Sequence, residues 1–265
     1  MKHTNKQLYI GIFLTSFLLL GVLLLRVFGF SATAIALGDT LSAPAFPHLF
    51  GTDHLGRDVM SRVGAGALST LSIAFFTVLI GGSFGLLFGT IAGYFGGLFD
   101  EVVMTVSDIF TAFPSLLFAL LVITFTGPGT IPLVWALGIL FIPSFARVVR
   151  GEVRRVKHLD YVQRAKLMGA STRRILIFHV FPSTLPVFLS ALTIGFNNAV
   201  LAEASMSFLG LGVLPPNVSL GRILAESQGY LQTAPWIAIS TGLVISLFIF
   251  SFSMLADGLR KKGEL

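Results

Sequence analysis

The 265-residue chain contains no cysteine and few charged residues. The lack of cysteine excludes disulfides, thiol catalysis and Cys-based metal sites, and leaves the redox compartment undetermined. Charged residues make up 11% of the chain, against about 25% in soluble domains. Hydrophobic residues make up 54%, and the mean hydropathy is +0.88. One soluble core cannot bury so much apolar surface, so the sequence predicts an integral membrane protein.

Six apolar runs are long enough to cross a membrane as helices. They cover residues 8–29, 67–92, 102–124, 131–148, 182–206 and 235–257. None alternates polar and apolar residues as β-barrel strands do, so the predicted fold is an all-α membrane protein with six transmembrane helices. Lys2 and Lys6 precede the first run and SATAIA follows it, as in a secretory signal peptide. Because the run exceeds the usual apolar length of about 7–15 residues, we expect a retained helix, with cleavage as the alternative.

The basic residues lie in alternate gaps between these runs. With the N-terminus in the cytoplasm, the cytoplasmic segments hold 14 of the 18 Lys and Arg residues. The outer segments hold three: Arg57, Arg62 and Arg222. This bias follows the positive-inside rule, so both termini are predicted to be cytoplasmic. Membrane topology thus explains the formal net charge of +6 better than nucleic-acid binding does.

Glycine recurs at every fourth position late in the second run. The positions are Gly81, Gly85, Gly89, Gly93 and Gly97. Such a stripe lets a neighbouring helix approach closely. Residues 81–85 also match the G-x-S-x-G motif of serine hydrolases, which requires a strand-to-helix turn and a partner histidine. This copy lies within a span, and all five histidines lie in or beside polar segments, so we interpret the stripe as helix packing.

Two acids and two asparagines stand out within the apolar runs: Asp108, Glu203, Asn197 and Asn198. Carboxylates inside a membrane are costly and usually face a cavity or a partner. Asp108 and Glu203 are therefore candidates for a translocation pathway, with a helix–helix hydrogen bond or an interfacial position as the alternative. The two asparagines could line the same pathway or bond a neighbouring helix.

A basic segment, DYVQRAKLMGASTRRILIFHVFP, covers residues 160–182 between the fourth and fifth runs. Asp160 can cap a short helix over residues 161–168, and Gly169 suits its left-handed end. Ser171 can cap a second helix that leads into the fifth run. One face of the first helix holds Tyr161, Ala165 and Met168. This small, irregular face suits a protein groove better than anionic lipid, the alternative interpretation.

Turn residues mark both outer segments. In GTDHLGRDVMSR, residues 51–62, Asp53 and Asp58 are placed as turn or cap residues. A metal site made from these two and His54 fits no standard ligand spacing, so we predict no metal ligand here. Residues 207–236 contain repeated Gly and Pro, and we expect this loop to fold over the outer mouth.

Several motifs, in consistent order, resemble those of ABC importer permeases. Gln163-Arg164-Ala165, followed by Gly169 and Pro182, resembles the cytoplasmic EAA loop of this family. Similarity to the second permease of dipeptide, oligopeptide and nickel importers extends from about residue 50 to 262. It rests on GTDHLGRD (51–58), AGYFGGLFDE (92–101), DIFTAFPSLL (108–117), ASMSFLGLGVLPP (204–216) and MLADGLRK (254–261). The sequence departs in having Gln-Arg-Ala for Glu-Ala-Ala, which suggests an acidic partner groove, and Leu220 where Trp is common.

This resemblance implies a heteromeric importer in the bacterial plasma membrane. Its partners would be a second homologous permease, two ATP-binding cassette subunits, an extracytoplasmic solute-binding protein and membrane lipid, with no nucleic acid. The short helix would dock in an ATPase cleft through Tyr161, Gln163, Arg164, Ala165 and Gly169. Because this chain has no G-x-x-x-x-G-K-[ST] motif, ATP and Mg²⁺ would be bound by the ATPases, with no cofactor on this chain. ATP-driven closure would push on this helix and tilt the spans in alternating access.

The resemblance also sets the expected organisation. It gives a cytoplasmic N-terminus and first helix (1–30), an extracytoplasmic segment (31–65), a core permease domain (66–257) with a cytoplasmic coupling loop (149–181), and a cytoplasmic tail (258–265). Peptides are the expected solute, and nickel or a metal chelate is the alternative. Without intramembrane His or Cys, nickel would be chelated or transiently held.

Two other classes of membrane protein would show different sequence features. A secondary transporter or channel would show inverted repeats or matched half-helices, and we find none. An intramembrane enzyme would need clustered catalytic groups, and apart from Asp108 and Glu203 the sequence offers none, so we predict no catalytic residue.

Overall fold

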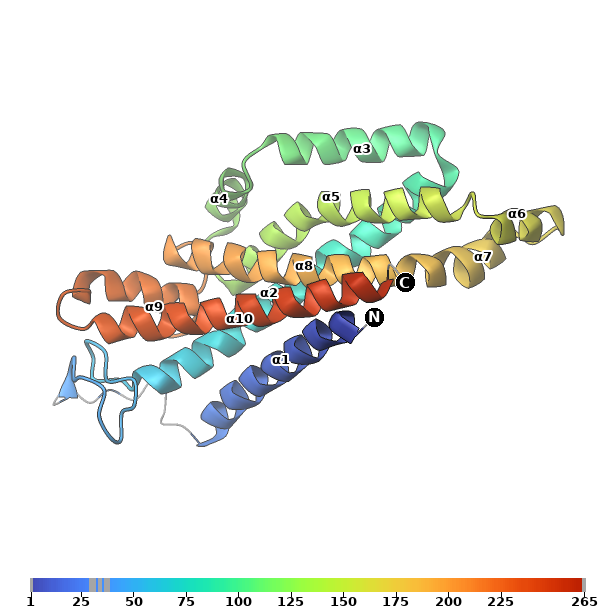
Figure 1. The fold of residues 1–265 in the computed structure, drawn as a ribbon. Coiled ribbons are helices and arrows are strands. Elements are labelled where there is room, and N and C mark those ends of the chain that lie inside the picture. The colour runs from blue at the N-terminus through green and yellow to red at the C-terminus, as the bar shows by residue number, and fades with distance from the viewer. Residues whose placement is uncertain (1, 29–31, 33–34, 36–38, 264–265) are drawn as a thin grey trace.

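The computed structural model describes residues 2–28, 32, 35 and 39–263, and its ordered elements are helices (Figure 1). They are α1 (Lys2–Phe28), α2 (Val59–Phe95), α3 (Gly97–Ala112), α4 (Ser115–Thr126), α5 (Thr130–Val156), α6 (Asp160–Leu167), α7 (Thr172–Ile175), α8 (Phe181–Phe208), α9 (Leu220–Ser227) and α10 (Pro235–Gly263). A π-helical turn, η2 (Leu176–Val180), joins α7 to α8, and a 3₁₀ turn, η3 (Gln228–Tyr230), follows α9. The predicted all-α membrane fold is confirmed.

Five helical segments in the described residues are long and apolar enough to cross a membrane alone. They are Lys6–Leu25, Val59–Phe95, Thr130–Val156, Thr172–Phe208 and Pro235–Arg260. The third predicted span, residues 102–124, is not the single continuous helix that we expected. It consists of parts of α3 and α4, which meet at an angle of 89°.

The bend between α3 and α4 has a local cause. Pro114 carries no backbone N–H and disfavours helical geometry in the residue before it. Phe113 accordingly adopts an extended conformation, with φ −86° and ψ 137°, and ends α3. Pro114 then starts α4, where its carbonyl oxygen accepts a hydrogen bond from the amide of Leu117 at 2.9 Å.

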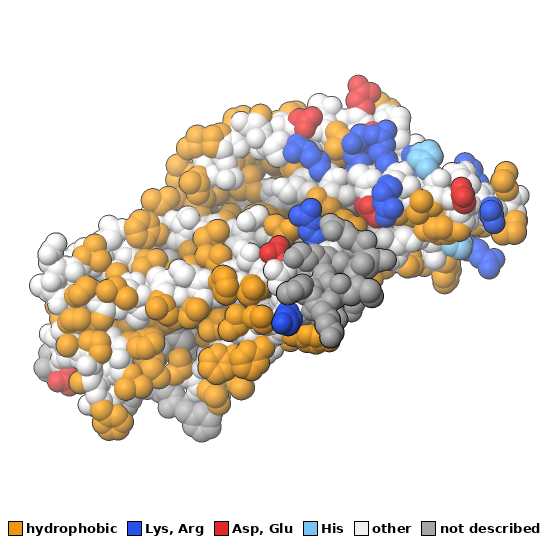
Figure 2. All heavy atoms as spheres, viewed as in Figure 1, with side chains coloured by type: hydrophobic (Ala, Val, Ile, Leu, Met, Phe, Trp, Pro, Cys, Tyr) orange, Lys and Arg blue, Asp and Glu red, His pale blue; other side chains and the backbone are white. Residues whose placement is uncertain are grey.

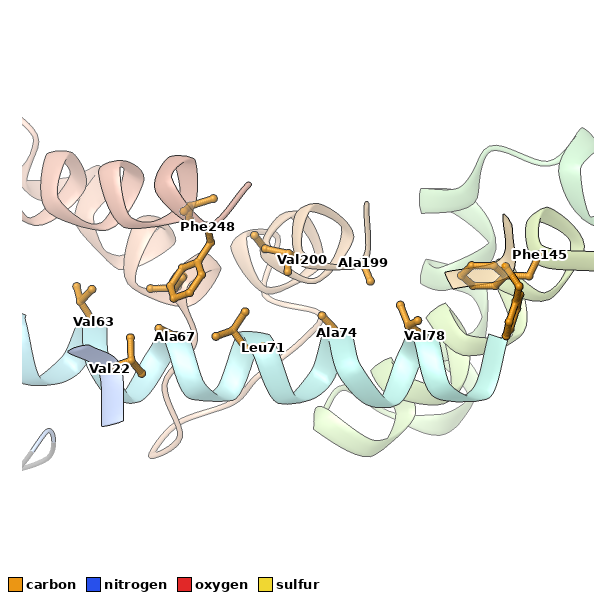
Figure 3. Packing of buried hydrophobic residues seen from close by; sticks show 14 of the residues in the cluster. Val22, Val63, Ala67, Leu71, Ala74, Val78, Phe145, Ala199, Val200 and Phe248 are labelled. Atoms are coloured by element: carbon orange, nitrogen blue, oxygen red, sulfur yellow. The ribbon is translucent and has the colours of Figure 1, made fainter. Parts of the chain in front are cut away.

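The apolar core is built around α2, which is flanked by α1, α5, α8 and α10 (Figure 3). One face of α2 contributes Val63, Ala67, Leu71, Ala74 and Val78. The residues that meet this face come from four helices: Val22 from α1, Phe145 from α5, Ala199 and Val200 from α8, and Phe248 from α10. Helices far apart in the sequence therefore pack against one central helix, α2.

The glycine stripe of α2 packs directly against α5, as predicted. A Cβ atom on Gly89 would lie 2.6 Å from the carbonyl oxygen of Ala146 and 2.8 Å from Cβ of Val149. Gly81, Gly85 and Gly93 have similarly close neighbours on α5. Gly97 does not belong to the stripe, contrary to the sequence prediction, because α2 ends at Phe95 and Gly97 begins α3 after a turn. The G-x-S-x-G match lies inside α2, with no strand-to-helix turn.

We expect Gly89→Ala to destabilise the protein, because its new methyl group would press on backbone atoms that cannot rotate away. Overpacking of this kind costs about 1–3 kcal/mol, which lowers the midpoint of thermal unfolding by about 3–10 °C. Gly242→Ala in α10 is the matched control, since a Cβ there meets nothing within 4 Å. Equal midpoints for the two variants would contradict close α2–α5 packing.

Both ends of the described chain lie close together. Gly11 of α1 packs against Leu255 of α10, and Gly258 packs against Leu8, so the two helices run antiparallel. Figure 1 shows these ends near α7, on the side from which α6 projects. This placement agrees with the predicted topology, in which the termini and α6 share one side of the membrane.

Candidate functional site

Helix α6 projects beyond the end of α5 and forms the first candidate site (Figure 1). Its N-cap is Leu159 rather than the predicted Asp160, which lies in the first turn, where a carboxylate is favourable to the helix dipole. Gly169 has a positive φ of +82°, as predicted for the helix end. Ser171 caps α7, as predicted, by accepting a hydrogen bond from the amide of Arg174.

Two side chains tie α6 to the helices on either side of it. The Nε2 atom of Gln163 donates a hydrogen bond to the carbonyl oxygen of Lys157, 2.7 Å away at the end of α5. The hydroxyl of Tyr161 lies 2.7 Å from the hydroxyl of Ser183, in the first turn of α8. A displacement of α6 would therefore be transmitted to two membrane helices.

One face of α6 packs inward against the rest of the chain. Val162 and Ala165 are buried against the chain, with Ala165 only 6% exposed. Tyr161 is partly exposed, whereas Leu167 and Met168 are 87% and 82% exposed. Of the face predicted to enter a protein groove, Tyr161 and Met168 are thus exposed, whereas Ala165 is covered by this chain.

The outermost side chains of α6 are Arg164, Lys166, Leu167 and Met168, which we call the α6 tip. Leu167 was missed by the sequence analysis, although an apolar residue between basic ones was a visible signal. The resemblance implies five docking residues, and four of them are exposed: Tyr161, Gln163, Arg164 and Gly169. Tyr161 and Gln163 also make the internal contacts described above. The fifth, Ala165, is buried.

Ion pairs secure the base from which α6 projects. The guanidinium of Arg150 binds both carboxylate oxygens of Asp100, with Nη2 to Oδ2 at 2.6 Å. The amine of Lys157 donates to the carbonyl oxygens of Gly93 at 2.8 Å and Tyr94 at 3.2 Å. These contacts join the adjacent ends of α2 and α3 to α5, and all three partners of α5 lie in the AGYFGGLFDE motif.

The second candidate site is a cleft of about 500 Å³ within the membrane region. The α3–α4 bend, α5 and α8 line it with aromatic, aliphatic and polar side chains. The polar residues of its wall are Thr111, Ser115, Ser144 and Asn198. Asp108 lies beside it and binds Arg147 at 2.8 Å, and the same guanidinium nitrogen lies 2.9 Å from the hydroxyl of Thr111.

The four predicted pathway residues therefore lie in different surroundings. Asn198 lines the cleft, and Asp108 is exposed next to it. Asn197 is not in the cleft wall, and its Oδ1 atom is buried. Glu203 is fully buried outside the cleft wall and accepts a hydrogen bond from the hydroxyl of Ser207, in the same helix, at 2.6 Å.

Residues 85–262 match the family model described as binding-protein-dependent transport system inner membrane component. The chain belongs to this family. A dipeptide transport system permease protein, DppC, from Alkalihalophilus pseudofirmus is 35% identical over 257 residues, covering 97% of this chain and 84% of the relative. The glutathione transport system permease protein GsiD of Escherichia coli O6:K15:H31 is 38% identical over 219 residues, covering 83% and 72%.

A chain of the MetNI methionine ABC transporter, in an inward-facing crystal structure, has the same fold. Its TM-score is 0.65 at 20% identity, covering 77% of this chain and 97% of that one. The protein is thus an ABC importer permease, a multi-pass protein of the bacterial inner membrane. Nothing in these comparisons favours a secondary transporter or a channel.

The permease carries a network of five charged residues at its outer end: Asp53, Arg57, Arg62, Arg222 and Glu226. We call it the outer ion network. Arg62, at the start of α2, binds Asp53 and, at 2.7 Å, Glu226 of α9. Asp53 and Arg62 are 1% and 3% exposed, and Nε of Arg62 has no hydrogen-bond partner in the described part of the chain.

Both carboxylates of the outer ion network have lowered pKa values despite their burial. Burial alone would raise the pKa of Asp53, but the backbone amide of Arg57 and the charge of Arg62 bring it below its usual value. Burial opposes ionisation of Glu226 in the same way, and the charge and hydrogen bond of Arg62 lower its pKa overall.

The other predicted outer residues have structural partners. Asp53 accepts hydrogen bonds from the amides of Leu55 and Arg57, and Asp58 caps α2 by accepting from the amide of Ser61, as predicted. The ring of His54 stacks on Tyr230. Among the described residues, no group of three His, Cys, Asp or Glu side chains is arranged to hold a metal ion.

Proposed function

We propose that this permease forms half of the pore of an importer for dipeptides or short oligopeptides. ATP hydrolysis on separate subunits would drive it, and an extracytoplasmic binding protein would deliver the solute. The peptide assignment is supported by the relatives named for dipeptide and glutathione transport.

The observation that carries this proposal is the double attachment of α6. Its tip is exposed beyond the membrane helices, while Gln163 bonds the end of α5 and Tyr161 meets Ser183 at the start of α8. An ATPase that grips the α6 tip would therefore move both helices. Since α5 and α8 also form walls of the cleft, such a movement would change its shape.

The cleft has the chemistry that a peptide requires. The amide of Asn198 and the hydroxyls of Thr111 and Ser144 can exchange hydrogen bonds with peptide groups, and Phe110 and Phe141 can cover apolar side chains. The lining residues include no His, Asp, Glu or Cys. Such a wall offers nickel no strong protein ligand, so the cleft favours a peptide over the metal alternative.

The remaining subunits follow from what this chain cannot do. It has no phosphate-binding motif, so ATP and Mg²⁺ would be held by two ATP-binding cassette subunits, and this chain would need no cofactor. A second, homologous permease would complete the pore. The ATPases and the loaded binding protein would each favour the outward-open form, because a ligand shifts an equilibrium only through its differential affinity for the two states.

The test is uptake of a labelled dipeptide into liposomes that contain the complete complex, with Ni²⁺ offered in parallel. We expect peptide uptake that requires both ATP and the binding protein. Asn198→Trp, which fills the cleft, should reduce uptake at least tenfold. Leu189→Trp is the matched control, because Leu189 is exposed on α8 but does not line the cleft.

Two outcomes would overturn this proposal. Uptake that continues without ATP would reopen the secondary-transporter alternative. Uptake of Ni²⁺ but not of peptide would replace the substrate assignment and leave the permease assignment intact.

A further inference from the structure

The helix that enters the membrane after α6 begins with two unpaired arginines. Arg173 and Arg174 of α7 are exposed, and among the described residues neither guanidinium has an acidic partner. Asp160 is the sole acid between residues 157 and 182, which hold three further cations, Lys157, Arg164 and Lys166, besides the two arginines.

 Residues 157–182 therefore hold five Lys and Arg residues against one carboxylate. Figure 2 shows blue side chains gathered at the end of the molecule that carries α6 and α7, whereas apolar side chains cover much of the rest.

Exposed apolar side chains continue the same helix face toward the membrane. Ile177 and Phe178 of η2 follow Arg173 and Arg174 by four residues, and Phe181 follows Ile177 by four. Residues at this spacing are neighbours on a helix surface. All three apolar side chains are exposed, with Phe178 at 69%. The face therefore changes from cationic to apolar within about two turns.

This order of groups matches a phospholipid better than it matches a protein surface. The stripe lies at the start of the candidate span Thr172–Phe208, where the helix passes from the cytoplasm into the bilayer. A soluble ATPase could reach the two arginines, but it could not cover Phe178 and Phe181 without entering the hydrocarbon region. Guanidinium groups bind phosphate with paired hydrogen bonds, and the cytoplasmic leaflet supplies anionic head groups.

We propose that an anionic phospholipid of the cytoplasmic leaflet binds at this stripe. Its phosphate contacts Arg173 and Arg174, and an acyl chain lies along Ile177, Phe178 and Phe181. The lipid thereby holds the α7–η2 connection at the membrane surface. Because this connection joins α6 to α8, the bound lipid fixes the point about which α6 turns.

The test measures retention of phosphatidylglycerol by the purified complex, using native mass spectrometry after titration with this lipid and with phosphatidylcholine. We expect wild type to bind phosphatidylglycerol preferentially. Arg173→Gln with Arg174→Gln should weaken that binding about 30-fold, since two cations near the surface are lost. Arg164→Gln with Lys166→Gln is the matched control, because it removes the same charge from the α6 tip and should change lipid binding less than twofold.

A third variant separates a lipid site from a simple phosphate site. Phe178→Ala keeps both arginines, and we expect it to weaken phosphatidylglycerol binding measurably. The proposal is overturned if the two double variants bind the lipid equally well, or if inorganic phosphate displaces it at equal concentration. Because this readout requires neither solute nor ATP, its failure would leave the proposed transport function untouched.

Discussion

A permease carrying Leu167→Asp and Met168→Asp should lose ATP-dependent uptake by at least a hundredfold while still inserting into the membrane. Both side chains are almost fully exposed at the α6 tip, so the substitutions disturb nothing inside this chain. In the proposed complex they would be buried against an ATPase, and burying each one contributes about 1.5–3 kcal/mol. The measurements are copurification of the ATPases and uptake of a labelled dipeptide.

A second variant separates binding of the ATPases at the α6 tip from transfer of the movement of α6 to α8. Tyr161→Phe removes the hydroxyl that meets Ser183 but leaves the α6 tip unchanged. We expect this variant to retain its ATPases and to hydrolyse ATP with less solute moved per ATP. If the aspartate variant kept its ATPases and its uptake, the α6 tip would not be the docking site.

Arg62→Met should be among the most destabilising substitutions in the permease. It leaves the buried carboxylate of Asp53 without its buried partner and frees Glu226 from α2. Removing one partner of a buried ion pair costs about 3–5 kcal/mol. Since Arg57 and Arg222 still contact these carboxylates, we expect the lower end, about 3 kcal/mol, or about 6–12 °C in the midpoint of thermal unfolding.

Arg57→Met is the matched control for this prediction. It removes the same charge from the same network, but Arg57 is more exposed than Arg62, so the midpoint should fall less. A larger effect of Arg57→Met would show that Arg62 is not the central cation.

The outer ion network should also respond to acid. Asp53 and Glu226 have lowered pKa values in the folded protein. Their contribution to the free energy of unfolding is therefore complete above the usual carboxyl range of about 4, and it is lost as the pH falls through the lowered values.

The sequence predicted those features that depend on neighbours along the chain. Apolar length located the spans, and the four-residue glycine period located the α2–α5 contact, because both properties repeat within one helix. The cap at Asp58 and the left-handed Gly169 are likewise local. The motif match to permeases then gave the family before any spatial information was used.

Features that depend on distant partners were less predictable. Pro143 and Pro186 lie inside α5 and α8, whereas Pro114 separates α3 from α4, so proline alone does not locate a bend. The covered face of α6 depends on where α5 ends. Arg62 and Glu226 are 164 residues apart, and no periodicity connects them.

The unbroken length of α2 has a mechanical consequence. Its 37 residues span about 55 Å, well beyond a hydrocarbon layer of about 30 Å. Arg62 fastens its outer end to α9, and the glycine stripe fastens its inner half to α5. If α2 tilts as one rigid rod by about 10° around its centre, each end moves about 5 Å, in opposite directions. Opening on one side of the membrane would then be geometrically tied to closing on the other.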